Sequence, residues 1–358
     1  MEGNKSPGLL TSSGKAMKRL VTLGAFLLGT CYGYTQQLPH YTQYILNNYI
    51  LNPALSGIEN YLDIKISGRD QWVGLNGAPK TAYLTVHAPL GKKDYKTTAT
   101  SFAVPGENPR GRAYWENYTA SEPHHGVGLS IINDRTGNFS RFTAAASYAY
   151  HIGLNPTTNL SAGFSAGVNT FGRNGSKSDF SGTGDPSDPA QAGASQIYKV
   201  HPHLSAGLWL YAADYFIGFS AQQIIPQRIS FQESEANGTG KLVPHLFATA
   251  GYRYLVNDDI NVLPSVMAKY VSNTPTAPQF DVNVKVQYRD LVWLGGSYRF
   301  KDGYAAMIGL NTGNVFNIGY AYDITQTRLN TTSKGTHELV IGFILGNDYG
   351  DTCPRNVW

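Results

Sequence analysis

From Tyr61 to Gly346, stretches of roughly ten residues in which apolar and polar side chains alternate are separated by turn residues. Successive side chains of a β-strand point to opposite faces, so each stretch has one apolar and one polar face. A soluble β-sandwich shows the same alternation, and two further features have to distinguish it from a membrane barrel. The clearest stretch alternates Phe280, Val282, Val284, Val286 and Tyr288 with Asp281, Asn283, Lys285, Gln287 and Arg289.

The first distinguishing feature is turn length. If both termini lie on the periplasmic side, the odd-numbered connections face outward, and they include the long stretches 172–199, 226–244 and 325–336. The even-numbered connections are mostly tight, as at 257–259. Short periplasmic turns and long outer loops are typical of outer-membrane barrels. We count about fourteen strands, which start near Tyr61, Thr81, Gly126, Phe139, Asn159, His201, Tyr215, His245, Ile260, Gln279, Leu291, Tyr304, Val315 and His337.

The second feature is the placement of aromatic residues, which gather towards the strand ends. Membrane barrels carry aromatic girdles at both interfaces. The pairs are Tyr148 with Tyr150, Tyr252 with Tyr254, Tyr298 with Phe300 and Tyr320 with Tyr322. The pattern therefore predicts an all-β fold: a transmembrane antiparallel β-barrel of about fourteen strands with long outer loops, in contact with outer-membrane lipid.

Composition excludes two other classes of protein. Charged residues make up 15% of the chain, the mean hydropathy is -0.26, and no apolar run of about eighteen residues occurs, so a helical membrane protein is excluded. The formal charge of the chain is only +4, and the Lys and Arg residues are scattered along the sequence. Nucleic-acid binding needs a clustered basic surface, and we expect none.

The N-terminus resembles a secretory signal. Lys18 and Arg19 precede an apolar run, 20–30, that is too short to span a bilayer. We place the signal peptide at residues 1–35, with cleavage between Cys31 and Gln36, and both Met1 and Met17 remain open as the start. A lipoprotein signal ending at Cys31 is a less favoured alternative, because Thr precedes the cysteine where a small residue is normal.

Three further segments follow the signal peptide. We assign 36–60, which does not alternate, as a pre-barrel periplasmic segment, 61–346 as the outer-membrane barrel, and 347–358 as a C-terminal tail. Residues 91–124 interrupt the regular pattern at the periplasmic side, so they are either an insertion or a sign that the strand parity is wrong there. Cys353 would be the only cysteine of the mature chain, which excludes an internal disulfide.

The sequence offers no constellation for catalysis. His124 and His125, like His201 and His203, have no Cys or carboxylate at usual ligand spacing, so we expect no metal site. Inward-facing serines such as Ser161 have neither a Gly-x-Ser-x-Gly elbow nor a paired base. We therefore predict no catalytic residues, no cofactor and no enzymatic activity.

Four short motifs resemble those of the PorP/SprF family of type IX secretion outer-membrane proteins, and together they span the mature chain. The first is Asn52-Pro53-Ala54-Leu55-Ser56-Gly57, which departs from the family pattern at Leu55 and Ser56. The others are Arg69-Asp70-Gln71-Trp72 with 77–79, Tyr322-Asp323 with His337-Glu338, and Cys353-Pro354-Arg355 near the end. The family-motif residues are Asn52, Pro53, Ala54, Gly57, Arg69, Gln71, Trp72, His337, Glu338, Cys353 and Pro354.

The resemblance implies a location in the cell outer membrane and work with other type IX secretion components. It implies a barrel that helps a secreted surface protein, such as a gliding adhesin, to be exported or held at the cell surface. A porin-like diffusion channel is the alternative, because a barrel of this size encloses a lumen. Since loops on a rigid scaffold make good recognition sites, we expect partner contacts in the two longest outer loops, at Lys177, Asp185, Glu233 and Glu235.

Overall fold

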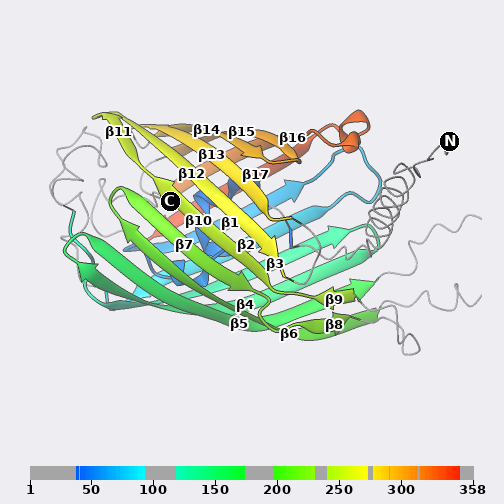
Figure 1. Cartoon of the computed structure of the whole chain (residues 1–358), viewed down its shortest axis with the longest axis horizontal. Helices are drawn as coiled ribbons and strands as arrows, with labels where there is room; N and C mark the ends of the chain where they lie inside the picture. The colour runs from blue at the N-terminus through cyan, green and yellow to red at the C-terminus, as the bar shows by residue number, and fades with distance from the viewer. Residues whose placement is uncertain are drawn as a thin grey trace, which may run out of the picture. The chain divides into compact units, whose positions relative to one another are not determined.

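The computed structural model describes residues 38–39, 41–92, 118–173, 197–229, 240–272, 277–289, 291–312 and 315–346. The chain divides into two compact units, Met1–Gln36 and Gln37–Trp358, and all described residues belong to the second. This unit is a closed antiparallel β-barrel (Figure 1). Its sheet has 15 strands, of which 14 form the ring and β11 is the extra one. The predicted fold is confirmed.

The ring closes between its first and its last strand. The first strand, β1, pairs with the last, β17, while β10 pairs with both β7 and β12. The barrel strands are β1 (Leu62–Asp70), β2 (Lys80–Leu90), β3 (His124–Thr136), β4 (Phe139–Asn155), β5 (Thr158–Arg173), β6 (Ile197–Ala212), β7 (Tyr215–Gln222), β10 (His245–Tyr252), β12 (Ile260–Val271), β13 (Gln279–Tyr288), β14 (Val292–Arg299), β15 (Gly303–Thr312), β16 (Phe316–Thr325) and β17 (Thr336–Leu345).

The remaining elements are short. Strand β11 (Tyr254–Asn257) continues β10 after Arg253, and β8 (Gln227–Ile229) pairs with β9 (Gly240–Leu242) as a separate hairpin. The 3-10 helices are η1 (Thr42–Leu46), η2 (Asn48–Ile50), η3 (Pro53–Leu55) and η7 (Arg328–Thr331). Within the described ranges, no helix combines the length and the apolar character needed to cross a membrane.

The two faces of the wall agree with the sequence pattern. In β13, Phe280 and Val284 are 49% and 42% exposed on the outside, whereas Asp281 and Asn283 are 1% and 0% exposed on the inside. An outward apolar face suits lipid and an inward polar face suits a lumen. Period-two alternation therefore predicted the two faces correctly.

The barrel has a short-turn end and a long-loop end. At the short-turn end, β4 connects to β5 through residues 156–157, β6 to β7 through 213–214, and β11 to β12 through 258–259. The other end carries the long connections, such as 326–335, although two of its turns, 137–138 and 300–302, are tight as well.

The described ends of the stretch that interrupts the pattern, 91–92 and 118–123, lie at the short-turn end. Strand β2 pairs antiparallel with both β1 and β3, so the strand parity holds across it. It is therefore an insertion between β2 and β3. Residues 93–117 lie outside the described part of the chain.

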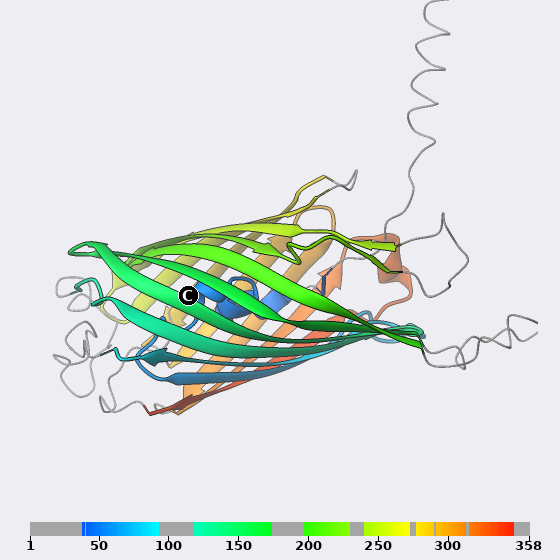
Figure 2. The ribbon, with the colours of Figure 1, turned by 90° about the horizontal axis from the view of Figure 1, so that it is seen from below.

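Residues 38–39 and 41–61, which we call the plug, differ most from expectation. The sequence pattern placed 36–60 in the periplasm, but the structure places the described part of this segment inside the barrel (Figure 2, blue). Within it, Gln43 and Ala54 are 0% exposed and Leu55 is 1% exposed. Its apolar residues point in several directions without a period, because they meet the barrel wall on all sides.

Candidate functional site

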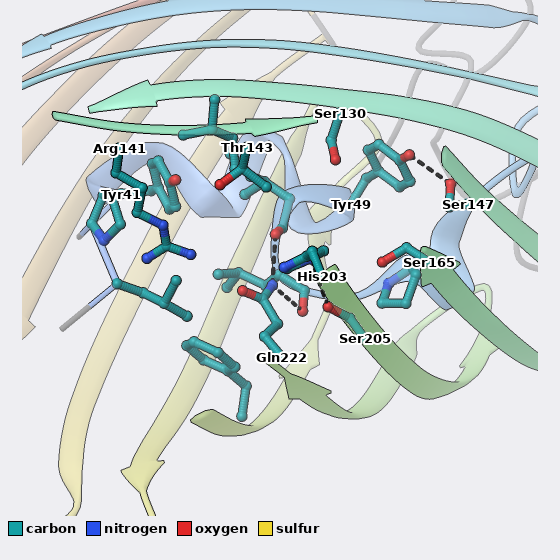
Figure 3. Close-up of a pocket in the computed structure, with 17 residues that line it drawn as sticks. Tyr41, Tyr49, Ser130, Arg141, Thr143, Ser147, Ser165, His203, Ser205 and Gln222 are labelled. Atoms are coloured by element: carbon teal, nitrogen blue, oxygen red, sulfur yellow. Dashed lines mark hydrogen bonds between the residues drawn. The ribbon is translucent and has the colours of Figure 1, made fainter. Parts of the chain in front are cut away.

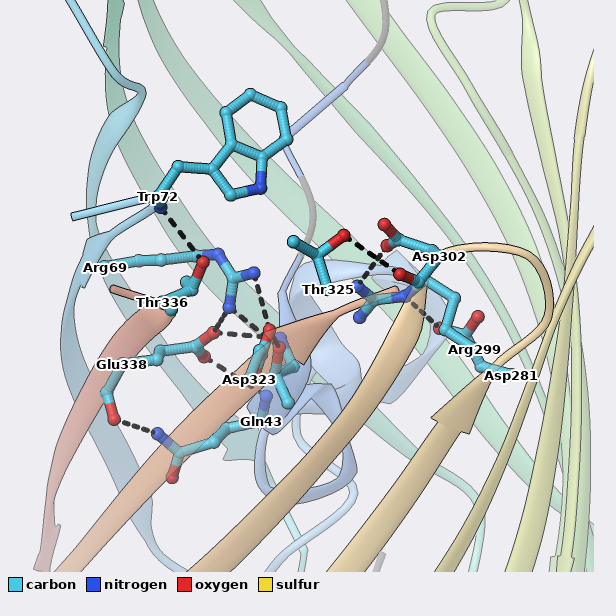
Figure 4. A network of polar contacts seen from close by, with 12 residues as sticks. Gln43, Arg69, Trp72, Asp281, Arg299, Asp302, Asp323, Thr325, Thr336 and Glu338 are labelled. Atoms are coloured by element: carbon cyan, nitrogen blue, oxygen red, sulfur yellow. Dashed lines mark hydrogen bonds and ion pairs between the residues drawn. The ribbon is translucent and has the colours of Figure 1, made fainter. Parts of the chain in front are cut away.

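One carboxylate of the wall fixes the first turn of the plug. Glu338, on β17 and 1% exposed, accepts hydrogen bonds from the backbone N–H groups of Thr42, at 2.9 Å, and Gln43, at 3.2 Å (Figure 4). The first N–H groups of a helix have no partner within it. The Gln43 side chain also donates to the backbone carbonyl of Glu338, at 2.8 Å. Glu338 thus holds the start of η1 through three hydrogen bonds.

Three further residues complete this contact, and together with Glu338 we call them the clamp: Thr42, Arg69 and Asp323. Arg69 Nη1 lies 2.7 Å from Glu338 Oε2, and Arg69 Nη2 lies 2.8 Å from Asp323 Oδ2. Arg69 also donates to Thr42 Oγ1 at 2.7 Å, and this hydroxyl donates to Asp323 at 2.5 Å. Burying charges costs desolvation energy, which only paired charges with further hydrogen bonds offset.

Strand register brings the clamp together. Pairing of β1 with β17 sets Arg69 opposite Glu338. Pairing of β16 with β17 sets Ala321 opposite Glu338, so Asp323, two residues further along β16, lies on the same inner face. The clamp therefore joins the plug to three adjacent strands, β16, β17 and β1, across the seam where the barrel closes.

The middle of the plug contacts β2 and β4, which follow β1 round the wall. Asn47 Nδ2 donates to Thr85 Oγ1 on β2 at 2.9 Å, and the Tyr49 hydroxyl lies 2.6 Å from Ser147 Oγ on β4. These wall residues are the polar, inward members of the alternating strands. The inner face thus supplies hydrogen-bond partners to the plug as well as polarity.

The motif Asn52-Pro53-Ala54 docks the plug on β5, β6 and β7. Asn52 Oδ1 accepts from the Ala54 N–H at 3.0 Å and so caps η3, with Pro53 at its first position. The Asn52 amide donates to the carbonyls of Leu208, at 3.0 Å, and Phe219, at 3.2 Å. Asn52 therefore caps the start of η3 and also anchors it to the wall.

The plug meets the wall most closely at Ser56 and Gly57. A Cβ on Gly126 would lie 1.8 Å from the Ser56 carbonyl oxygen, and Gly57 has a positive φ of 73°. Gly is favoured where backbones approach this closely and where φ is positive. His151 Nε2 lies 2.8 Å from the Ser56 carbonyl oxygen, and His124 Nε2 lies 3.2 Å from that of Gly57.

These histidine contacts bear on the metal expectation. The His124 and His151 rings stack with centroids 4.5 Å apart, and both face plug carbonyls. His203 contacts Asn169 and Ser205, and His125 lies on the outside beside Tyr148. Within the described residues, no group of three or more His, Cys, Asp or Glu side chains could hold a metal ion.

A second buried ion network lies beside the clamp. Arg299 donates to Asp281 at 3.3 Å and to Asp302 at 2.8 Å (Figure 4). A separate cavity of about 40 Å³ lies between the plug and the wall, and it is lined by residues that include Tyr41, Arg141, His203 and Ser205 (Figure 3). This volume holds on the order of three water molecules.

The predicted motif residues fall into three groups. Asn52, Pro53, Ala54 and Gly57 lie in the plug, and Arg69 and Glu338 lie in the clamp. The second group, Gln71, Trp72 and His337, borders the long-loop end. The Gln71 N–H donates to the Pro79 carbonyl at 2.9 Å, and the Trp72 N–H donates to Thr336 Oγ1 at 3.1 Å. His337 points outward to the Tyr320 hydroxyl. The third group, Cys353 and Pro354, lies outside the described residues. The candidate partner contacts also lie outside them: Lys177, Asp185, Glu233 and Glu235.

Sequence reasoning missed the plug side of these contacts. Thr42 and Gln43 carry no local motif, and no periodicity marks them. The one available signal was the presence of Arg69 and Glu338 at inward positions, where isolated charges need partners.

Comparison with families of known proteins gives one match. The family described as type IX secretion system membrane protein PorP/SprF matches residues 34–343. No curated protein sequence matches the chain.

Several solved structures have a similar arrangement of strands. The Ralstonia pickettii toluene transporter TbuX is 12% identical, with 84% of this chain and 93% of that chain covered and a TM-score of 0.46. The CymD monoaromatic hydrocarbon channel is 10% identical, with 84% and 91% covered and a TM-score of 0.45. A Pseudomonas aeruginosa FadL homologue is 10% identical, with 86% and 94% covered and a TM-score of 0.41.

Proposed function

Because the chain belongs to the PorP/SprF family of type IX secretion system membrane proteins, we propose that it is a non-enzymatic outer-membrane barrel that helps a secreted surface protein, such as a gliding adhesin, to be exported or held at the cell surface. The observation that carries the proposal is the filled lumen. A barrel of this size can enclose an aqueous channel, yet here the plug occupies its interior with side chains as buried as Gln43, Ala54 and Leu55.

The filling of the lumen distinguishes this role from that of a diffusion channel. Conduction needs a continuous polar path, and the plug is bonded to the wall along its length, from the clamp to the close contact of Ser56 with Gly126. A barrel whose lumen is filled by the plug would act by binding other proteins at its exposed surfaces. The surface protein and the other secretion components would then meet its two ends.

We assign the two ends different partners. The long-loop end faces outward, where a secreted protein would meet the loops that contain Lys177, Asp185, Glu233 and Glu235. The insertion 91–123 and the tail with Cys353 and Pro354 would face the periplasmic secretion machinery. Short periplasmic turns and long outer loops in this family of folds support the assignment.

The test is to shorten both outer loops, at 174–196 and 230–239, which leaves every barrel strand intact. We expect the surface protein to appear in the medium while the amount of barrel in the membrane stays unchanged. The amount is measured by immunoblot, and folding by the gel shift of the unboiled protein. Cell-attached cargo after this deletion would contradict docking at the outer rim.

A second measurement separates the proposal from the channel alternative. The purified wild-type barrel in planar bilayers should show no steady conductance. A stable open level in the wild-type protein would favour the porin-like function instead.

A further inference from the structure

The cavity between the plug and the wall lies away from the clamp. The strands that line it are β3 to β7 and β10, whereas the clamp joins β16, β17 and β1. Figure 3 shows Tyr41 of the plug beside Arg141 of β4 at one edge of this cavity. Arg141 is two residues from Thr143, which is 3% exposed on the inner face, so the Arg141 side chain points inward as well.

Arg141 and Tyr41 bring donors to the cavity without a protein acceptor for them. Within the described ranges, Arg141 forms no ion pair and no hydrogen bond, and its guanidinium carbon lies 5.4 Å from the centroid of the Phe171 ring. The Tyr41 hydroxyl, on a residue that is 8% exposed, likewise has no hydrogen-bond partner among those residues. An unpaired charge inside a protein is costly, so this site favours a ligand that accepts hydrogen bonds and carries negative charge.

The wall does not supply that negative charge. Asp134 on β3 is the cross-strand neighbour of Arg141, but its carboxylate accepts a hydrogen bond of 2.6 Å from Thr81 Oγ1 on β2 and forms no ion pair with Arg141. A second cation lies nearby instead. Lys269 on β12, 5% exposed, is paired in register with Phe247, which lines the cavity. The charge on this side of the lumen is therefore positive.

From these contacts we infer that the cavity binds a small oxyanion of the phosphate or carboxylate class, held by the Arg141 guanidinium and the Tyr41 hydroxyl. The planar guanidinium presents two parallel N–H donors that match two oxygens of such a group. The phenol hydroxyl can donate to a further oxygen. The cavity volume of about 40 Å³ limits the ligand to roughly the size of a free phosphate or acetate ion.

The ligand would attach the plug to the wall at a second place. Tyr41 directly precedes Thr42, which the clamp holds on the other side of the lumen. An oxyanion bound by both Tyr41 and Arg141 would join the plug to β4. Because a ligand that binds only the folded state stabilises it, the anion should make the barrel with its seated plug harder to unfold. This inference does not depend on the proposed function.

Urea unfolding of the purified barrel in detergent tests the inference. The folded form is followed by the gel shift of the unboiled protein, in sodium phosphate, sodium acetate or sodium chloride at one pH and one ionic strength. We expect the urea midpoint of the wild type to rise and then saturate as phosphate or acetate replaces chloride. Phosphate also stabilises proteins in general through exclusion from their surface, so variants have to separate the two effects.

Arg141→Gln should lose the saturable rise, because it removes the charged fork. Arg135→Gln is the matched control, since it removes an exposed arginine from the neighbouring strand β3 and should keep the rise. A folded Arg141→Gln barrel that keeps the full rise would overturn the inference. So would the absence of a saturable rise in the wild type with either ion, or its loss in Arg135→Gln as well.

Tyr41→Phe covers the case in which Arg141→Gln does not fold. It removes only a hydroxyl, and no hydrogen bond within the described residues is lost with it. We expect its midpoint in chloride to stay near that of the wild type and its dependence on phosphate to become several-fold weaker. A Tyr41→Phe barrel with the same phosphate dependence as the wild type would show that the anion is not held in this cavity.

Discussion

Arg69 and Glu338 are separated by 269 residues in the sequence, and their side chains form an ion pair of 2.7 Å. They lie on the first and the last strand of the barrel, which pair only when the ring closes. Because the same Glu338 carboxylate holds the first turn of the plug, closure of the barrel and seating of the plug are coupled through a single side chain.

Glu338→Gln should destabilise the barrel. It leaves Arg69 with one carboxylate fewer in a buried site and weakens the acceptor for the Thr42 and Gln43 N–H groups. Removal of one partner of a buried ion pair typically costs about 3–5 kcal/mol. We expect the folded form, seen as the gel shift of unboiled protein, to be lost at a lower urea concentration.

The matched control for this change is Lys80→Gln. Lys80 pairs with Asp70 at 3.0 Å, but the two side chains are 69% and 43% exposed. Exposed pairs contribute only about 0–1 kcal/mol, so the urea midpoint should hardly move. Equal shifts for both variants would mean that the clamp is no stronger than a surface ion pair.

Gly126→Ala should disturb the seating of the plug. The added methyl group would meet the Ser56 carbonyl oxygen at 1.8 Å, so one backbone has to move. Overpacking of this kind costs about 1–3 kcal/mol, and more when neither side yields. Gly296→Ala is the control, since a Cβ there has nothing within 4 Å. Thermal unfolding should show a lower midpoint for the first variant alone.

The sequence predicted the wall of the barrel far better than its contents. Alternation is local, so Val284 and Lys285 reveal their faces within a few residues, and the starts of the strands follow from it. The plug has no period, because its side chains meet a wall on every side. Its position depends on a lumen that exists only after all strands pair, so no local pattern places Thr42 beside Glu338.

The candidate site was recovered only in part for the same reason. The motif residues Arg69, Asn52 and Gly57 were identified, but as separate motifs, since nothing in the sequence shows that they meet. His124 invited a metal interpretation because it precedes another histidine. In the structure its ring contacts the Gly57 carbonyl, a partner that lies 67 residues away in the sequence.

Charge on the two faces of β13 provides a further test. Val284 is 42% exposed on the lipid side, and an Arg at the midplane of the bilayer costs about 2–4 kcal/mol. We therefore expect Val284→Arg to reduce the amount of assembled barrel. Lys285→Gln keeps a polar side chain on the inner face and should be tolerated. Similar damage from both variants in a membrane-fraction immunoblot would contradict the assignment of faces.

Replacement of residues 38–58 by a short Gly-Ser linker should convert the closed barrel into a pore. The wall that remains has a polar inner face, on which Asn283 of β13 no longer donates a hydrogen bond to the Tyr44 hydroxyl, and an aqueous lumen conducts ions when it is continuous. Planar bilayers should then show stable open levels for the linker variant and none for the wild type. A folded linker variant without conductance would show that the wall itself closes the lumen. The inward indoles of Trp209 and Trp293, which are 0% and 3% exposed, would then be the first residues to replace.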